Sequence, residues 1–258
     1  MKRIFASRRT RWAAIVILIV LPAMLAAYSV FEFRRPNSFG EDHGFLNFFA
    51  NNSDWILGLL FLAISAVPFL LVFERRRPQA RELVPIAVMS ALAVVGRTVF
   101  SIVPLPNFKP CSAIIMITAI VFGPETGFLT GALTAFVSNF IFGQGPWTPW
   151  QMFAFGIVGF LGGLIFRRKR GKWKHFHLWL CIYGGLSVLV IYGFLLDTAS
   201  VFMGMGGINK AAFLAMYASG FPMNVIHGSA TVIFLAVLGE PMLAKLERIR
   251  KKYGILEP

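Results

Sequence analysis

Long apolar segments alternate with short polar or basic ones along the whole chain. A bilayer core of about 30 Å needs roughly 20 apolar residues in a helix, and eight segments approach that length. They cover residues 12–31, 55–73, 83–103, 110–122, 125–142, 150–166, 176–196 and 221–245. The fourth is short, and only Gly123 and Pro124 separate it from the fifth, so the two are expected to form a tight helical hairpin at one membrane face. The pattern predicts an all-α membrane protein with eight spans.

The basic residues indicate how these spans are oriented. With a cytoplasmic N-terminus, twenty of the 25 Lys and Arg residues lie in cytoplasmic segments and four lie outside. Membrane proteins carry such an excess of Lys and Arg in their cytoplasmic loops. Both termini are therefore predicted to be cytoplasmic, and the outer connections are 32–54, 104–109, 143–149 and 197–220.

The first span has a second interpretation. Its basic start and the small residues Ala23, Ala26 and Ala27 near its end are also typical of a secretory signal peptide. Its apolar run is longer than the usual hydrophobic core of such a peptide, which favours an uncleaved helix. Cleavage would not change the orientation of the later spans.

Composition supports the membrane interpretation. Hydrophobic residues make up 57% of the chain and charged residues 14%, and the mean hydropathy is +0.71; soluble domains carry about 25% charged residues. The net charge of +14 comes from short basic clusters between apolar segments. That distribution favours contact with anionic lipid and argues against a nucleic-acid partner.

The outer connection before the sixth span combines residue types suited to binding. From Gly143 to Gln151 the sequence contains Gly, Pro, Trp, Gln and Thr and no charged residue. Gly and Pro fix a non-helical path, while Trp147, Trp150 and the Gln side chains offer stacking surfaces and hydrogen bonds. An aromatic belt at the interface explains either Trp alone, but it does not explain the polar residues between them, so a binding surface is favoured.

Further candidates lie in or near the outer ends of other spans. Arg97 sits about 9 Å below the outer end of its helix, where an Arg either extends to the interface or faces a ligand or a loop. Asn107 and Lys109 belong to a loop with three prolines, and a stiff loop loses little entropy when a ligand binds. Asn139 and Asn224 lie within spans, where such residues often only bond neighbouring helices.

Catalytic and ion-coupling groups are not evident. The sequence shows no nucleophile–base pair, no chain of carboxylates in the spans and no Gly-rich phosphate loop. His227 has no Cys, Asp or Glu at metal-ligand spacing. We therefore predict no enzymatic activity, no metal and no cofactor, and expect a partner to supply the energy for any transport.

Small residues at four-residue spacing predict close helix contacts. Gly127 with Gly131, and Gly159 with Gly163, are expected to pack inside the bundle. A further pair, Ala87 and Ala91, lies in the cytoplasmic half of the third span.

These features together resemble the substrate-binding S component of energy-coupling factor (ECF) vitamin transporters. The resemblance covers the six spans of residues 81–246, the Ala87–Ala91 motif, and the run from Phe122-Gly-Pro-Glu to Ser138-Asn139-Phe140. It leaves residues 1–80 as two additional N-terminal membrane helices and residues 247–258 as a basic cytoplasmic tail.

The resemblance implies a multi-pass subunit in the plasma membrane of a prokaryote, without ATPase activity. Such a subunit binds a micronutrient from outside and docks through Ala87 and Ala91 on a T component carried by two ATPase subunits, which use ATP. The ligand would lie under the outer loops. The expected ligand-binding residues are Arg97, Asn107, Phe108, Lys109, Asn139, Gln144, Trp147, Thr148, Trp150, Gln151 and Asn224.

The loop Gly-Gln-Gly-Pro-Trp-Thr-Pro-Trp is most similar to that of the cobalamin type within the family, so cobalamin is the predicted ligand. A flat nucleobase-like compound such as a queuosine precursor suits the same residues. A polytopic membrane enzyme and a structural scaffold are the alternatives from other classes.

Overall fold

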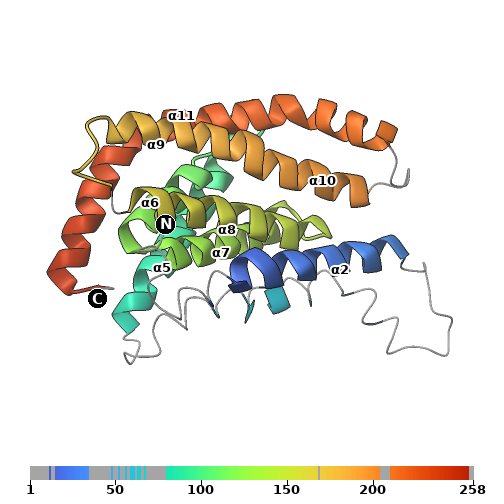
Figure 1. Cartoon of the computed structure of the whole chain (residues 1–258), viewed down its shortest axis with the longest axis horizontal. Coiled ribbons are helices and arrows are strands. Elements are labelled where there is room, and N and C mark those ends of the chain that lie inside the picture. Colours follow the sequence, from blue (N-terminus) through green and yellow to red (C-terminus); the bar gives the residue numbers. More distant parts are fainter. Residues whose placement is uncertain are drawn as a thin grey trace.

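The computed structural model describes residues 15–34, 80–167, 169–203 and 210–255, together with residues 12, 48, 52, 56, 59–61, 63, 64 and 67. Within this part every regular element is a helix (Figure 1). Most of the predicted second span, residues 55–73, and of the first outer connection lies outside the described residues.

The hairpin predicted at Gly123-Pro124 is confirmed. Helix α5 (Ala80–Val99) continues into the short helix η2 (Phe100–Ile102), and α6 (Cys111–Phe122) and α7 (Pro124–Phe142) follow. Gly123 alone joins α6 to α7 and has a φ of 124°, a region that side chains disfavour and Gly adopts freely. Pro124 then takes the first helical position, where its missing N–H costs no hydrogen bond.

Helix α8 (Trp147–Phe166) begins three residues earlier than predicted. Trp147, Thr148 and Pro149 form its first turn, and the Thr148 amide donates to the Gly145 carbonyl at 2.8 Å. Pro149 was expected to lie in the loop, but proline is tolerated in the first turn of a helix because amides there have no partner within the helix. The connection before α8 is therefore only residues 143–146.

The prediction of a long outer loop over residues 197–220 is wrong. Helices α9 (Phe176–Leu186), η3 (Ser187–Tyr192) and α10 (Gly193–Met203) follow one another without a break. Helix α11 already begins at Lys210 and ends at Tyr253, with Pro222 and Pro241 inside it. Its early part is rich in Ala, Leu and Met, which favour helix, and this preference extends the helix beyond the apolar span.

The bundle has α6, α7 and α8 at its centre. Helix α5 packs on α6 and α7, α11 packs on α6, α9 and α10, and α2 (Leu21–Arg34) lies beside α8 and α10 (Figure 1). The C-terminal part of α11, drawn in red, turns away from the rest of that helix (Figure 1). Pro241 removes a backbone hydrogen bond there, and proline is the usual cause of a sharp helix bend.

Glycines let the central helices approach closely, as the spacing predicted. A Cβ atom on Gly127 would lie 2.2 Å from the Ala119 Cβ, and one on Gly163 would lie 2.8 Å from the Pro124 Cα. The contact of Gly163 is with backbone, which cannot move aside as the tip of a side chain can. These positions therefore fix how α8 sits against the α6–α7 hairpin.

Four of the described helical segments are long and apolar enough to cross a bilayer: Leu83–Ile102, Trp147–Phe166, Phe176–Met203 and Lys210–Tyr253. Helix α6, with 12 residues, is apolar but shorter. These helices make the chain a membrane protein by length and composition.

Candidate ligand-binding site

A cavity of about 180 Å³ lies between α5, α8, α10 and α11, next to the loop that joins η2 to α6. Five of the predicted ligand-binding residues line it: Arg97, Asn107, Lys109, Gln151 and Asn224. The other lining residues are Cys111, Phe155, Tyr192, Leu196, Asp197, Gly220, Met223 and His227. The site is therefore built from segments that are far apart in the sequence.

Arg97 is buried in the bundle and does not extend to the interface. Its side chain is 8% exposed, and its Nη1 atom donates hydrogen bonds to the Ser138 hydroxyl and, at 3.0 Å, to the Asn139 Oδ1 atom. The guanidinium carbon also lies 4.8 Å from the centre of the Phe142 ring. These contacts hold a positive charge in a fixed position at the cavity wall.

Asn139 connects Arg97 to the Trp-containing connection. Its Nδ2 atom donates to the Thr148 hydroxyl and to the Gln151 Oε1 atom, both at 3.0 Å. Thr148 in turn donates to the Gln144 Oε1 atom at 2.8 Å. Asn139, Gln144 and Thr148, all expected to bind ligand, thus bond one another behind the cavity wall, and Gln151 presents the network to the cavity.

The predicted aromatic residues lie outside the cavity. Trp147 is 41% exposed, and Trp150 is buried and stacks on Phe202 of α10 with ring centres 6.4 Å apart. The Phe108 ring packs against Phe100 and Phe234. Trp150 thus packs α8 against α10, and Phe108 packs the loop before α6 against η2 and α11.

Lys109 brings a second cation to the cavity. Its ammonium group lies 4.7 Å from the centre of the Phe142 ring, the same ring that Arg97 faces. Partial burial, and then the positive charge of Arg97, lower the pKa of Lys109 below its usual range. Asn107, two residues earlier, has a φ of 62°, a left-handed conformation that Asn adopts more readily than most residues.

The opposite wall carries a carboxylate that the sequence analysis did not select. The Asn224 Nδ2 atom donates to Asp197 Oδ2 at 2.8 Å, and a Cβ atom on Gly220 would lie 2.2 Å from Asp197 Oδ1. Asp197 was assigned to a loop, so its position on α10 facing α11 was not expected. The cavity thus has two cations on one side and a carboxylate–amide pair on the other.

His227 and Tyr192 form the floor of the cavity between these walls. The His227 Nε2 atom lies 2.9 Å from the Ser112 hydroxyl, and the Tyr192 ring packs edge-on against the His227 ring at 4.8 Å. Asn224 was among the expected ligand-binding residues, whereas His227 was considered as a metal ligand and was not selected; nothing in the sequence marked Tyr192 or Phe155.

The predicted partner-binding residues lie elsewhere. Ala87 and Ala91 are exposed on α5, among exposed apolar side chains that include Val84, Val88 and Leu92. The two small residues leave a shallow strip on an apolar helix face.

Comparison with known proteins finds relatives over most of the described helices. The chain is similar to a UPF0397 protein of Vibrio atlanticus, with 26% identity over 183 residues that cover 67% of this chain and 94% of the relative. It is also similar to a UPF0397 protein of Clostridium perfringens, with 26% identity over 162 residues that cover 60% of this chain and 80% of the relative. No solved structure matches the chain.

The family comparison covers most of the chain, including every residue that lines the cavity. The sequence pattern of the family described as "ECF-type riboflavin transporter, S component" matches residues 78–248. S components of ECF transporters are substrate-binding membrane subunits without enzymatic activity, and they work with a T component and ATPases. The chain belongs to the ECF-type riboflavin transporter S component family.

Proposed function

We propose that this subunit captures a small, flat nitrogen heterocycle from outside a prokaryotic cell and passes it to an ECF module in the plasma membrane. The observation that carries the proposal is the polar cavity itself, which places the cations Arg97 and Lys109 opposite the carboxylate–amide pair of Asp197 and Asn224. Such a cavity offers donors on one wall and an acceptor on the other. A heterocycle with carbonyl oxygens along one edge and N–H groups along another matches that arrangement.

The size of the cavity favours a compact ligand. Pockets for drug-sized molecules occupy about 300–1,000 Å³, and this cavity has about 180 Å³. A corrinoid such as cobalamin is much larger than one ring system and would require the walls to move far apart. A flavin such as riboflavin, which the family's name gives as substrate, and a nucleobase-like queuosine precursor are flat and fit the volume better.

The charged residues of the cavity also favour a flat heterocycle with several polar groups. An apolar ligand would offer no new partner to the buried Arg97 or to the partly buried Asp197, and displacing water from these charged groups without replacing its hydrogen bonds costs binding energy. A ligand with several carbonyl and N–H groups satisfies them. The aromatic side chains of Phe155 and Tyr192 lie in the same cavity and offer surfaces for a flat ring.

Delivery of the ligand requires the partner proteins. In this proposal Ala87 and Ala91 dock on the T component, since small residues let a partner helix approach closely. Two ATPase subunits then supply the energy. Residues 1–80 are predicted to contain two further spans, and none of their described residues lines the cavity.

A ligand panel tests this function. The purified full chain is heated with riboflavin, with a queuosine precursor, with cobalamin or without additive, and the midpoint of thermal unfolding is recorded. A ligand present at 100 times its Kd stabilises the folded state by about 2.7 kcal/mol, so a binder raises the midpoint by several degrees. A flat heterocycle is expected to do so and cobalamin is not; stabilisation by cobalamin alone would overturn the proposed ligand class.

A further inference from the structure

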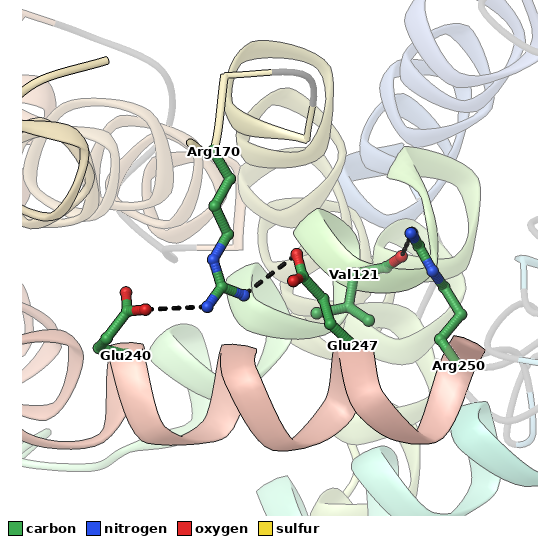
Figure 2. A network of polar contacts seen from close by, with 5 residues as sticks. All are labelled: Val121, Arg170, Glu240, Glu247 and Arg250. Atoms are coloured by element: carbon green, nitrogen blue, oxygen red, sulfur yellow. Dashed lines mark hydrogen bonds and ion pairs between the residues drawn. The ribbon is translucent and has the colours of Figure 1, made fainter. Parts of the chain in front are cut away.

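The basic connection between α8 and α9 is fastened to α11 through Arg170. The Arg170 Nη2 atom donates to Glu240 Oε1 at 2.9 Å, and Nη1 lies 3.1 Å from Glu247 Oε1 (Figure 2). Nearby, Arg250 donates to the Val121 carbonyl at 2.7 Å, which ties the end of α11 to the end of α6 (Figure 2). One side of the connection is therefore held in place by charge pairs.

The other side of this connection borders a groove of about 740 Å³ between α8 and α9. Its walls are largely apolar and open to the surroundings: Ile165, Ile182 and Leu186 are 40%, 40% and 55% exposed. Trp173 and Trp179 line the groove beside the connection. Exposed apolar surface on a membrane helix faces lipid chains, and Trp marks the level of the headgroups.

Two exposed lysines stand at the edge of the groove. Lys172 and Lys174 line it and are exposed, and neither forms an ion pair with any residue in the described part of the chain. Arg170, in contrast, contacts two acidic residues of α11, Glu240 and Glu247. The lysines thus leave uncompensated positive charge directly beside an apolar groove.

We propose that this groove binds an anionic phospholipid of the cytoplasmic leaflet. The phosphate lies at Lys172 and Lys174, and an acyl chain runs along Ile165, Ile182 and Leu186. The distribution of basic residues assigns this end of α8 to the cytoplasmic side, where anionic lipids attract basic residues close to the membrane. The site lies at the opposite end of α8 from the ligand cavity and does not depend on which ligand the cavity binds.

The charge and the shape of the groove select this occupant together. A neutral phospholipid satisfies the apolar walls but places no net negative charge at the two lysines. A soluble phosphate satisfies the lysines but leaves the walls empty. An anionic phospholipid satisfies both.

Native mass spectrometry of the full chain tests the site. The protein is mixed with phosphatidylglycerol or with phosphatidylcholine of the same acyl chains, and retained lipid is counted for the wild type, for Lys172→Gln/Lys174→Gln and for Ile182→Trp. Lys251→Gln/Lys252→Gln is the matched control, because it removes the same charge from exposed positions at the end of α11. All four lysines are exposed, so these variants are expected to fold.

The wild type is expected to retain phosphatidylglycerol in preference to phosphatidylcholine. The Lys172/Lys174 variant should lose about fivefold in retention per lysine, while the control stays within about twofold of the wild type. Ile182→Trp fills the groove and should lower retention of the lipid with all lysines intact.

Three results would overturn the proposal. Equal retention of phosphatidylglycerol and phosphatidylcholine would show that the charge of the headgroup does not contribute to binding. An equal loss in the Lys251/Lys252 control shows general attraction to the surface. Displacement of the lipid by glycerol phosphate at low concentration, with Ile182→Trp without effect, identifies a soluble phosphate as the occupant.

Discussion

Arg97 of α5 and Asn139 of α7 are joined by a hydrogen bond of 3.0 Å inside the bundle. Through this bond a charge at the cavity wall is positioned by the same amide that holds Thr148 and Gln151 at the start of α8. The ligand cavity and the outer connection are thus one hydrogen-bonded unit, and a change at either is expected to affect the other.

Replacing Arg97 with Gln should weaken ligand binding and leave the helices in place. Hydrogen bonds to a charged group contribute about 1.5–3 kcal/mol, so the Kd of the ligand found in the thermal panel should rise at least about tenfold by isothermal titration. Arg248→Gln, on an exposed face far along α11, is the matched control and should bind as the wild type does. An unchanged Kd for Arg97→Gln would show that Arg97 does not contact the ligand.

Thr148→Val tests whether the outer connection is held by its hydrogen-bonded network. The change keeps the shape of the side chain but removes the hydroxyl that bonds Asn139, Gln144 and the Gly145 amide. Leaving buried polar groups without partners costs about 1–3 kcal/mol, which lowers the unfolding midpoint by roughly 2–12 °C in a chain of this size.

Thr118→Val is the control for that change. Thr118 is equally buried, but its hydroxyl donates only to the Ile114 carbonyl of its own helix at 2.8 Å. That carbonyl keeps its helical role without the hydroxyl, so a smaller shift is expected. Equal shifts in the two variants would show that the network adds nothing beyond the loss of one hydroxyl.

The sequence was sufficient for four apolar helices long enough to cross a bilayer and for the Gly123-Pro124 hairpin, because apolar length and turn chemistry are local properties. It also selected Arg97, because a cation within a span is costly unless it has a partner, and Asn107 with Lys109, because both lie in a stiff loop with three prolines. It did not reveal that Asn139 faces Arg97 while Gln144 and Thr148 face each other, because that depends on how α5, α7 and α8 are rotated in the bundle. Asp197 was missed for a related reason: helical extension beyond an apolar span leaves no hydrophobic pattern.

Gly163→Ala and Gly162→Ala each add a methyl group at neighbouring positions of α8. The two changes are expected to lower the stability of the fold by different amounts. A Cβ atom at position 163 meets the Pro124 Cα at 2.8 Å and the Ala119 carbonyl oxygen at 3.0 Å, both backbone. At position 162 its nearest neighbour is a ring carbon of Tyr183 at 3.3 Å. Overpacking costs about 1–3 kcal/mol, so Gly163→Ala should lower the unfolding midpoint clearly more than Gly162→Ala. The reverse order would contradict the packing of α8 on the hairpin.

The lowered pKa of Lys109 should make ligand affinity depend on pH. Burial and the charge of Arg97 lower the pKa of Lys109 from its usual 10.5, so the ammonium loses its proton at a lower pH than an exposed lysine does. Because the charged form donates to the ligand in this proposal, affinity should fall as pH rises through the lowered pKa, before pH 10.5 is reached. In Lys109→Arg the side chain stays protonated, and the alkaline fall should disappear. A fall at the same pH in both proteins would assign it to another group.

The lowered pKa of Lys109 also makes the free energy of unfolding depend on pH. This dependence is opposite in direction to that of ligand affinity. Between the folded and the unfolded pKa of Lys109, the unfolded chain binds more protons, so the free energy of unfolding rises with pH in that window. Stability and affinity should therefore change in opposite directions over the same alkaline range, and unfolding measured without ligand separates the two effects.

Ala91→Leu should separate ligand capture from partner docking. Ala91 is exposed on α5 and does not line the cavity, so the variant should bind ligand with an unchanged Kd. The larger side chain prevents the close helix approach that small residues allow, so co-purification with the T component and ATPases, and uptake of ligand by cells, should be lost. Val237→Leu, which enlarges an exposed residue on α11, should retain both. Loss of ligand binding in Ala91→Leu would mean that this helix face shapes the cavity. Full transport by Ala91→Leu would show that the docking surface does not include this face of α5.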